Sequence, residues 1–224
     1  MECSGNLLIG HFQQIRLNAH SSTQAIAMFQ SGGTGLILTW FIFALMALLF
    51  IPASAMLGKV LSRADTPYLS TATFMGVLSS TLQSVGLMRW VFVIPILAKE
   101  YVNSTSNVRR EAIAIAYQIV HQYGGVVIGE HLGQILLVGW TLGVSIAMLH
   151  SHLFKSWVGW LGIFTVPFWM LGQSELLATV IPSTPVWEVA AVGFMMWEVW
   201  LMIVGIFLLR ASKKRVILNS QLEP

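Results

Sequence analysis

The sequence predicts an all-α fold, a polytopic transmembrane helical bundle with five spans and one further surface or half-buried helix. Of its 224 residues, 56% are hydrophobic and only 9% are charged, whereas soluble domains carry about 25% charged residues. Several apolar runs exceed the roughly 20 residues that cross the hydrocarbon core as a helix. These runs are continuous and do not alternate in polarity, which excludes a transmembrane barrel. We therefore expect the lipid bilayer to be a partner of this chain.

The charge balance fits the same class. The formal net charge is +3, and the basic residues lie at the ends of the apolar runs, where lipid headgroups attract them. No basic stripe with interleaved aromatic residues occurs, so we expect no nucleic-acid partner. Cys3 is the one cysteine, which excludes an internal disulfide and cysteine-based metal or redox motifs. We expect no metal and no cofactor.

The chain is predicted to have three parts: an N-terminal surface segment over 1–33, a transmembrane helical domain over 34–210 and a basic cytoplasmic tail over 211–224. The helical domain holds the apolar runs, and short polar stretches separate them. Each run is long enough to cross the hydrocarbon core. The predicted spans, in chain order, are at about 35–57, 70–98, 126–149, 157–180 and 188–209.

Within the N-terminal segment, the residues from Ser21 to Gln24 have the pattern of a capping box. They predict the start of a short helix, and Gly32-Gly33 would end it because glycine is the usual residue after a helix. We expect this short helix to lie on the surface of the bundle.

The stretch 111–150 contains no proline. As one helix it would be about 60 Å long at 1.5 Å per residue, twice what a bilayer needs. We therefore predict a split at Gly124-Gly125, where glycines allow a bend. Residues 112–124 would then form the half-polar surface helix, and residues 126–149 would form the third span.

Orientation follows from the basic residues. If Lys59 and Arg63 lie in a cytoplasmic loop, alternation of the spans places Lys155 and the tail from Arg210 to Arg215 inside as well. Fewer basic residues then remain outside. The C-terminus is therefore predicted to be cytoplasmic and the N-terminus to be outside.

The stretch 118–134 concentrates imidazole, carboxylate, amide and glycine in an otherwise apolar chain. Read as an α-helix, it places His121, Gly125, Gly129 and Gly133 along one ridge, because residues four apart share a face. Glycines let another helix approach closely. The ridge has two interpretations: it packs against a neighbouring span of the same chain, or it forms the seam of a homodimer.

With the predicted orientation, polar residues of four spans lie in the outer half of the membrane. Their charges do not balance, because there is one cation and four carboxylates. The cation is Arg89, and the carboxylates are Glu130, Glu175, Glu188 and Glu198. Some carboxylates should then be protonated, solvated or matched by a bound cation. The hypothesis is a polar cavity for an ion, a proton or a small polar ligand, in a transporter-like or sensor-like protein. The candidate residues are Arg89, His121, Glu130, His131, Gln134, Gln173, Glu175 and Glu198.

The main alternative is a non-catalytic structural or accessory membrane subunit, in which Glu198 pairs with Arg89 and holds two helices together. A third reading is an intramembrane enzyme or a haem protein, with His121 and His131 as ligands. On one α-helix these two imidazoles lie about 80° and some 15 Å apart, which is too far for a shared metal. Nucleophile-elbow, zinc-protease and phosphate-loop motifs are missing from the sequence, so we name no catalytic residue.

Two stretches carry a resemblance to a known family: Lys155-Ser-Trp-Val-Gly-Trp-Leu-Gly162 and Trp197-Glu198-Val-Trp200-Leu-Met-Ile-Val-Gly205. With them, the chain over about 20–210 resembles an uncharacterised bacterial multi-pass membrane family, domain of unknown function 4386. The resemblance implies a six-helix membrane protein with a long fourth helix and no established activity. The family's first hydrophobic helix has no evident counterpart in 1–33, so the chain is expected to be a fragment or a natural truncation.

Overall fold

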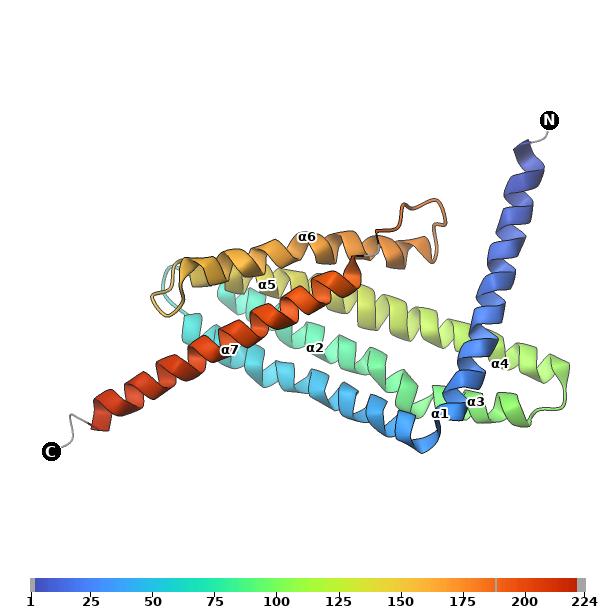
Figure 1. Ribbon diagram of the computed structural model, residues 1–224, viewed down its shortest axis with the longest axis horizontal. Helices are drawn as coiled ribbons and strands as arrows, with labels where there is room; N and C mark the ends of the chain where they lie inside the picture. Colours follow the sequence, from blue (N-terminus) through green and yellow to red (C-terminus); the bar gives the residue numbers. More distant parts are fainter. Residues whose placement is uncertain (1–2, 188, 221–224) are drawn as a thin grey trace. The chain divides into compact units, whose positions relative to one another are not determined.

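The computed structural model describes residues 3–187 and 189–220. All secondary structure in these residues is helical, and none of them lies in a strand (Figure 1). The predicted all-α class is therefore confirmed. In chain order the elements are α1 (Cys3–Leu61), α2 (Leu69–Phe92), α3 (Ile94–Asn103), α4 (Asn107–Val120), the π-helix η1 (His121–Leu132), α5 (Gly133–Leu149), α6 (Ser156–Ala178) and α7 (Ala190–Ser220).

Within the described residues, four helical stretches are long and apolar enough to cross a membrane. The predicted span at 157–180 forms α6, whose 23 residues are also long enough for the roughly 30 Å of hydrocarbon. α6 is not among the four, because its glycines, its tryptophans and the polar run from Gln173 to Glu175 make it less apolar. A fifth span therefore stays a prediction. The four stretches are Thr23–Leu61, Leu69–Asn103, Asn107–Leu149 and Ala190–Ser212.

The N-terminal segment is a helix that begins at Cys3 and is broken at Gly33, where φ is 57° and ψ is −155°. Glycine adopts a positive φ without the steric cost of a Cβ. The expectation that the glycine pair ends this helix is confirmed at Gly33. The expected start at Ser21 is wrong, because an N-cap residue needs non-helical backbone angles and Ser21 lies within the helix.

The predicted split at Gly124-Gly125 is also wrong. The chain stays helical from Asn107 to Leu149, and the glycines lie in η1, a π-helix of 12 residues. In a π-helix each carbonyl accepts from the N–H five residues further on, so the backbone is satisfied although the helix is wider. A break would leave backbone N–H and C=O groups without partners in apolar surroundings, which costs several kcal/mol per group.

The chain divides into two compact units. The first unit comprises Met1–Ala47 and Gln83–Gly129, and the second comprises Leu48–Leu82 and Glu130–Pro224. α1, α2 and η1 contribute to both, because the limits of the units fall inside these helices. Each unit has a packed interior of its own.

Tryptophans fill the interior of the second unit. Trp140 of α5 and Trp200 of α7 are fully buried, with ring centroids 5.9 Å apart in an edge-to-face arrangement that aromatic pairs favour. Trp200 Nε1 donates to the carbonyl of Val158 at 2.9 Å. Trp197 Nε1 donates to Thr141 Oγ1 at 2.9 Å. These two hydrogen bonds tie α7 to α6 and to α5.

The interior of the first unit combines stacked rings with a close backbone contact. Trp90 of α2 stacks on Trp40 and Phe29 of α1, with centroid separations of 5.2 and 5.6 Å. Where α2 meets η1, a Cβ on Gly129 would lie 3.0 Å from the Cα of Gly86. Two facing glycines therefore let these helices approach more closely than side chains would allow.

Candidate functional site

Three polar side chains form a hydrogen-bonded chain in the second unit, and we call it the polar chain. His131, near the end of η1, lies next to Gln173 of α6, with 2.8 Å between His131 Nδ1 and Gln173 Oε1. Gln173 Nε2 donates to Gln134 Oε1 at 2.5 Å. Gln173 is buried, and the other two side chains are half-buried. The polar chain thus joins η1 and α5 to α6.

The bonds of the polar chain also fix its hydrogen positions. Because Gln173 donates through Nε2, its Oε1 is the acceptor that faces His131. The neutral imidazole must then carry its proton on Nδ1, which leaves a lone pair on Nε2. Neither this Nε2 nor the amide nitrogen of Gln134 bonds to another of the described residues. The polar chain therefore ends in one acceptor and one donor.

Two residues that follow Gln173 hold the start of α7. Glu175 Oε1 accepts a hydrogen bond from the backbone N–H of Ala190, the first residue of α7, at 3.3 Å. Ser174 Oγ accepts from the backbone N–H of Trp187 at 3.1 Å. A carboxylate at a helix N-terminus accepts a hydrogen bond from an otherwise unbonded N–H and interacts favourably with the positive end of the helix dipole. Glu175 therefore has a structural partner.

Arg89 is buried in the first unit. Its Nη1 donates to the carbonyl of Gly86 at 2.6 Å, and its Cζ lies 5.2 Å from the ring centroid of Trp90, within the range of a cation–π contact. A Cβ on Gly125 would collide with the guanidinium. The glycine of η1 therefore provides the space that Arg89 occupies.

His121 lies among aromatic rings of the same unit. Its ring is parallel to Tyr117, with centroids 5.7 Å apart and 5° between the planes. It also meets Trp90 edge-on at 6.0 Å. Trp90 thus contacts both His121 and Arg89. Arg89 and His121 therefore lie around the same tryptophan in the first unit.

The eight candidate residues divide between the units. Arg89 and His121 belong to the first, while Glu130, His131, Gln134, Gln173, Glu175 and Glu198 belong to the second. His131, Gln134 and Gln173 are in direct contact. Glu130 is half-buried, and Glu198 is exposed on α7. Convergence of all eight stays a prediction, and Glu188 lies outside the described residues.

The three glycines of the predicted ridge are all buried. Gly125 and Gly129 pack against Arg89 and Gly86 of α2 within the first unit. Gly133 lies in the second unit, where its carbonyl accepts a hydrogen bond from Ser79 Oγ at 2.7 Å. In both units the glycines face α2 of the same chain.

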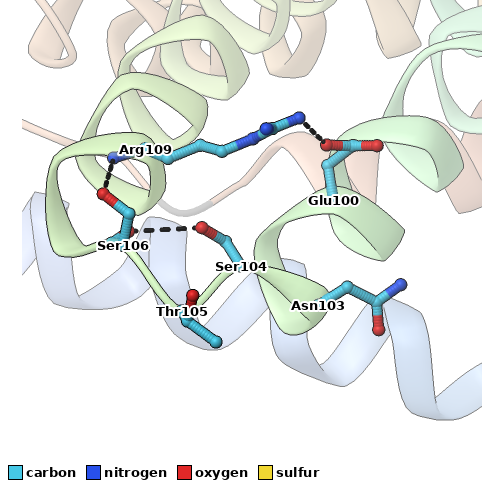
Figure 2. A pocket seen from close by; sticks show the side chains of 6 residues that line it. All are labelled: Glu100, Asn103, Ser104, Thr105, Ser106 and Arg109. Carbon is cyan, nitrogen blue, oxygen red and sulfur yellow. Dashed lines mark hydrogen bonds and ion pairs between the residues drawn. The ribbon is translucent and has the colours of Figure 1, made fainter.

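A polar pocket of about 290 Å³ was not predicted. It lies at the turn between α3 and α4, and Figure 2 shows its side chains gathered around that turn. Glu100 and Arg109 form an ion pair across it. The stretch 99–110 is rich in polar residues, but a pairing between residues nine apart depends on how the turn closes. The pocket is lined by Glu100, Asn103, Ser104, Thr105, Ser106 and Arg109.

The polar groups of this pocket largely satisfy one another. Ser106 Oγ accepts from the backbone N–H of Arg109 at 3.4 Å and caps α4 (Figure 2). Ser104 Oγ donates to the carbonyl of Ser106 at 3.2 Å. In the described part of the chain, no group of three or more His, Cys, Asp and Glu side chains is close enough to hold a metal. The hydrogen bonds and the ion pair of these residues therefore stabilise the turn between α3 and α4, and the described residues here do not resemble a metal centre.

A second, apolar groove of about 550 Å³ runs along α6. Trp157, Trp160 and Phe164 line it and are about half exposed or more. Its lining side chains come from one helix and offer no ionisable group. Such a surface suits lipid chains or another apolar helix and carries no chemistry of its own.

A family model with the description "domain of unknown function (DUF4386)" matches residues 7–205. The match begins earlier than the expected start near residue 20, within the segment 1–33. Among curated proteins and among solved structures, no match to the chain was found. The family match extends from α1 into α7, so the chain belongs to the family of domain of unknown function 4386.

Proposed function

We propose that the chain is a multi-pass protein of the bacterial inner membrane that binds a proton, a small cation or a small polar ligand at the polar chain. α6 would be its fifth span, and the C-terminus would be cytoplasmic. The role would be that of a transporter or of a sensor. The observation that carries the proposal is the contact of His131 and Gln134 with the buried Gln173.

The two ends of the polar chain support a ligand role. His131 Nε2 and the amide nitrogen of Gln134 are not among the buried polar atoms that lack a partner, so another molecule can reach both of them. Here the Nε2 lone pair of His131 and the amide nitrogen of Gln134 are left for another molecule. A proton or an ammonium group fits the imidazole nitrogen, and an acceptor oxygen fits the amide.

The surrounding charges favour a cation over an anion. α5 contains no ionisable residue, and α6 contains only Glu175. Glu130 and Glu198 are the other acidic residues of η1 and of the apolar part of α7. No Lys or Arg occurs between Gly133 and Leu149 or between Ser156 and Ala178. An anion would therefore meet carboxylates and no compensating cation.

The test measures thermal unfolding of the purified chain in detergent, followed by tryptophan fluorescence, at pH 5 to 8. Na⁺, K⁺, ammonium and choline serve as probes, because a ligand that binds the native state raises the unfolding temperature. We expect at least one probe, or the proton, to shift the wild-type curve. Gln173→Leu should abolish that shift. Thr81→Val is the control, since Thr81 Oγ1 bonds within α2, to the carbonyl of Val77.

The proposal fails if the wild-type curve does not respond to pH or to any probe, or if Gln173→Leu responds as the wild type does. In that case an accessory membrane subunit is the better reading. Its support is the apolar surface of the helices: in the most apolar 18 residues of Thr23–Leu61, only 6% of residues are buried. A helix so little covered suits packing against lipid or against another membrane protein.

A further inference from the structure

α7 has one ionisable side chain within its apolar stretch. From Ala190 to Leu209, Glu198 is the only Asp, Glu, Lys, Arg or His. It lies about 12 Å along the helix axis from Ala190, at 1.5 Å per residue. Ala190–Ser212 is long and apolar enough to cross a membrane. The carboxylate is therefore well inside this helix and away from both ends.

Glu198 lies on the side of α7 that its own unit leaves uncovered. Trp197 and Trp200 are buried, whereas Glu198 is exposed. Within its unit Glu198 makes no hydrogen bond and no ion pair with a described residue. Residues three and four positions away share its strip of the helix surface. On this strip the exposed neighbours are apolar: Phe194, Met195 and Met202.

The chemistry of this strip defines its partner. A carboxylate among apolar side chains in a membrane needs a cation or hydrogen-bond donors, because no water solvates it there. Methionine and phenylalanine around it provide adaptable apolar contacts for a helix. The matching surface is therefore an apolar membrane helix that presents one positively charged side chain at the same depth.

A second copy of this chain does not offer that surface. A symmetric contact through α7 would bring the two Glu198 carboxylates together, because an isologous interface uses the same patch on both copies. Where the structure describes side-chain exposure, the exposed basic residues lie in connections, near helix ends or, for Arg210, directly after the apolar stretch of α7: Lys59, Arg63, Lys99, Arg109, Arg110, Lys155 and Arg210. Arg89, which lies inside an apolar stretch, is buried.

We infer that the Glu198 strip (Phe194, Met195, Glu198 and Met202) docks a transmembrane helix of a different protein that carries Lys or Arg at the depth of Glu198. The apolar members pack against that helix, and Glu198 pairs with the cation. This goes beyond ligand binding at the polar chain, because none of its three residues belongs to the strip.

The test reconstitutes the full chain, with a fluorescent donor on Cys3, in phosphatidylethanolamine–phosphatidylglycerol vesicles. Two designed 23-residue Leu/Ala helices with identical flanks carry the acceptor, and one has Lys where the other has Leu, at the depth of Glu198. Energy transfer measures association. We expect the Lys helix to bind about three- to tenfold more tightly, the range of interhelical polar contacts in bilayers. Glu198→Gln should remove the preference.

Val192→Gln is the matched control, since it adds an amide to an exposed position of α7 outside the strip and keeps the carboxylate. It should retain the preference for the Lys helix. Equal binding of the two helices to the wild type overturns the inference, as does a preference that survives in Glu198→Gln. Light scattering of the purified chain adds a further check. A dimer that becomes monomeric in Glu198→Gln would make a second copy the occupant and would also overturn it.

Discussion

Two long apolar helices of this protein differ in how much protein covers them. In the most apolar part of Thr23–Leu61, 6% of the residues are buried, against 50% in that of Asn107–Leu149. Both are apolar enough to cross a membrane. Hydropathy therefore identifies each as a membrane-crossing candidate, but it does not tell which of them is surrounded by other helices.

Small and polar residues account for the difference. The buried helix contains glycines that contact Gly86, Met75 and Ala72 of α2, and its Gln134 reaches Gln173. Close approach and interhelical hydrogen bonds are what hold helices together when lipid is as apolar as the side chains. The less covered helix instead exposes large aliphatic and aromatic side chains: Leu38, Ile42, Phe43, Leu45, Met46 and Leu49.

Truncation of a large side chain should give the largest contrast between the two helices. Trp140, on the covered helix, is 1% exposed, and Phe43, on the other, is 51% exposed. We expect Trp140→Ala to lower the free energy of unfolding by about 3–5 kcal/mol, because it leaves a cavity. Phe43→Ala should change it by less than about 0.5 kcal/mol. Reversible unfolding in mixed micelles measures both, and equal losses would break the comparison.

Enlargement of a glycine should give the next largest contrast. Gly129→Leu would push a side chain into the backbone of Gly86, so we expect it to destabilise the chain by about 1–3 kcal/mol or more. A Cβ added at Gly35 on the less covered helix would meet no atom within 4 Å, so Gly35→Leu should be tolerated. The same unfolding assay, with light scattering, reads both variants. A Gly129→Leu chain that keeps its stability but loses a dimer would instead make the ridge a homodimer seam.

Removal of one hydrogen-bonding side chain should have a smaller effect. Gln173→Leu deprives both His131 and Gln134 of a partner, and we expect a loss of about 0.6–2 kcal/mol. Thr39→Val, on the less covered helix, removes only a bond to the carbonyl of Gly35 within the same helix, at 2.9 Å, and should have almost no effect. If the two variants lose the same stability, the polar chain does not hold the helices.

Truncation of an aliphatic side chain on the less covered helix should also have little effect. Ile42 is 55% exposed, so Ile42→Ala should change the unfolding free energy of the isolated chain by less than about 0.5 kcal/mol. The buried counterpart is Val144→Ala on α5, where Val144 is 0% exposed and a cavity would cost more. A large loss for Ile42→Ala would show that this helix is covered after all.

Part of the fold could be predicted because it depends on local sequence. Continuous apolar runs of sufficient length indicated the all-α class and five spans, four of which fall in helical stretches that are long and apolar enough to cross a membrane. The break at Gly33 followed from the positive φ that glycine tolerates. The π-helix could not be predicted, because an apolar pattern does not distinguish hydrogen bonds four residues apart from hydrogen bonds five residues apart.

The site depends on contacts between distant residues, and these could be predicted only in part. His131, Gln134 and Gln173 were candidates because polar groups are costly in apolar helices. Their mutual contact depends on the register between η1, α5 and α6, which no local pattern fixes. The exposure of Glu198 was likewise not readable, because α7 is apolar on all sides and its sequence does not indicate which side is packed.

The start of α7 has a consequence for the length of the connection before it. Ser174 and Glu175 of α6 accept hydrogen bonds from the backbone N–H groups of Trp187 and Ala190. These bonds hold the end of the connection next to α6, so they set the position of α7 along α6 independently of the length of the loop. Extra residues inserted near Thr184 would enlarge the loop without sliding one helix along the other. Each doubling of a flexible loop costs only about 0.6 kcal/mol, which makes this connection a suitable place to insert a tag or a fusion domain.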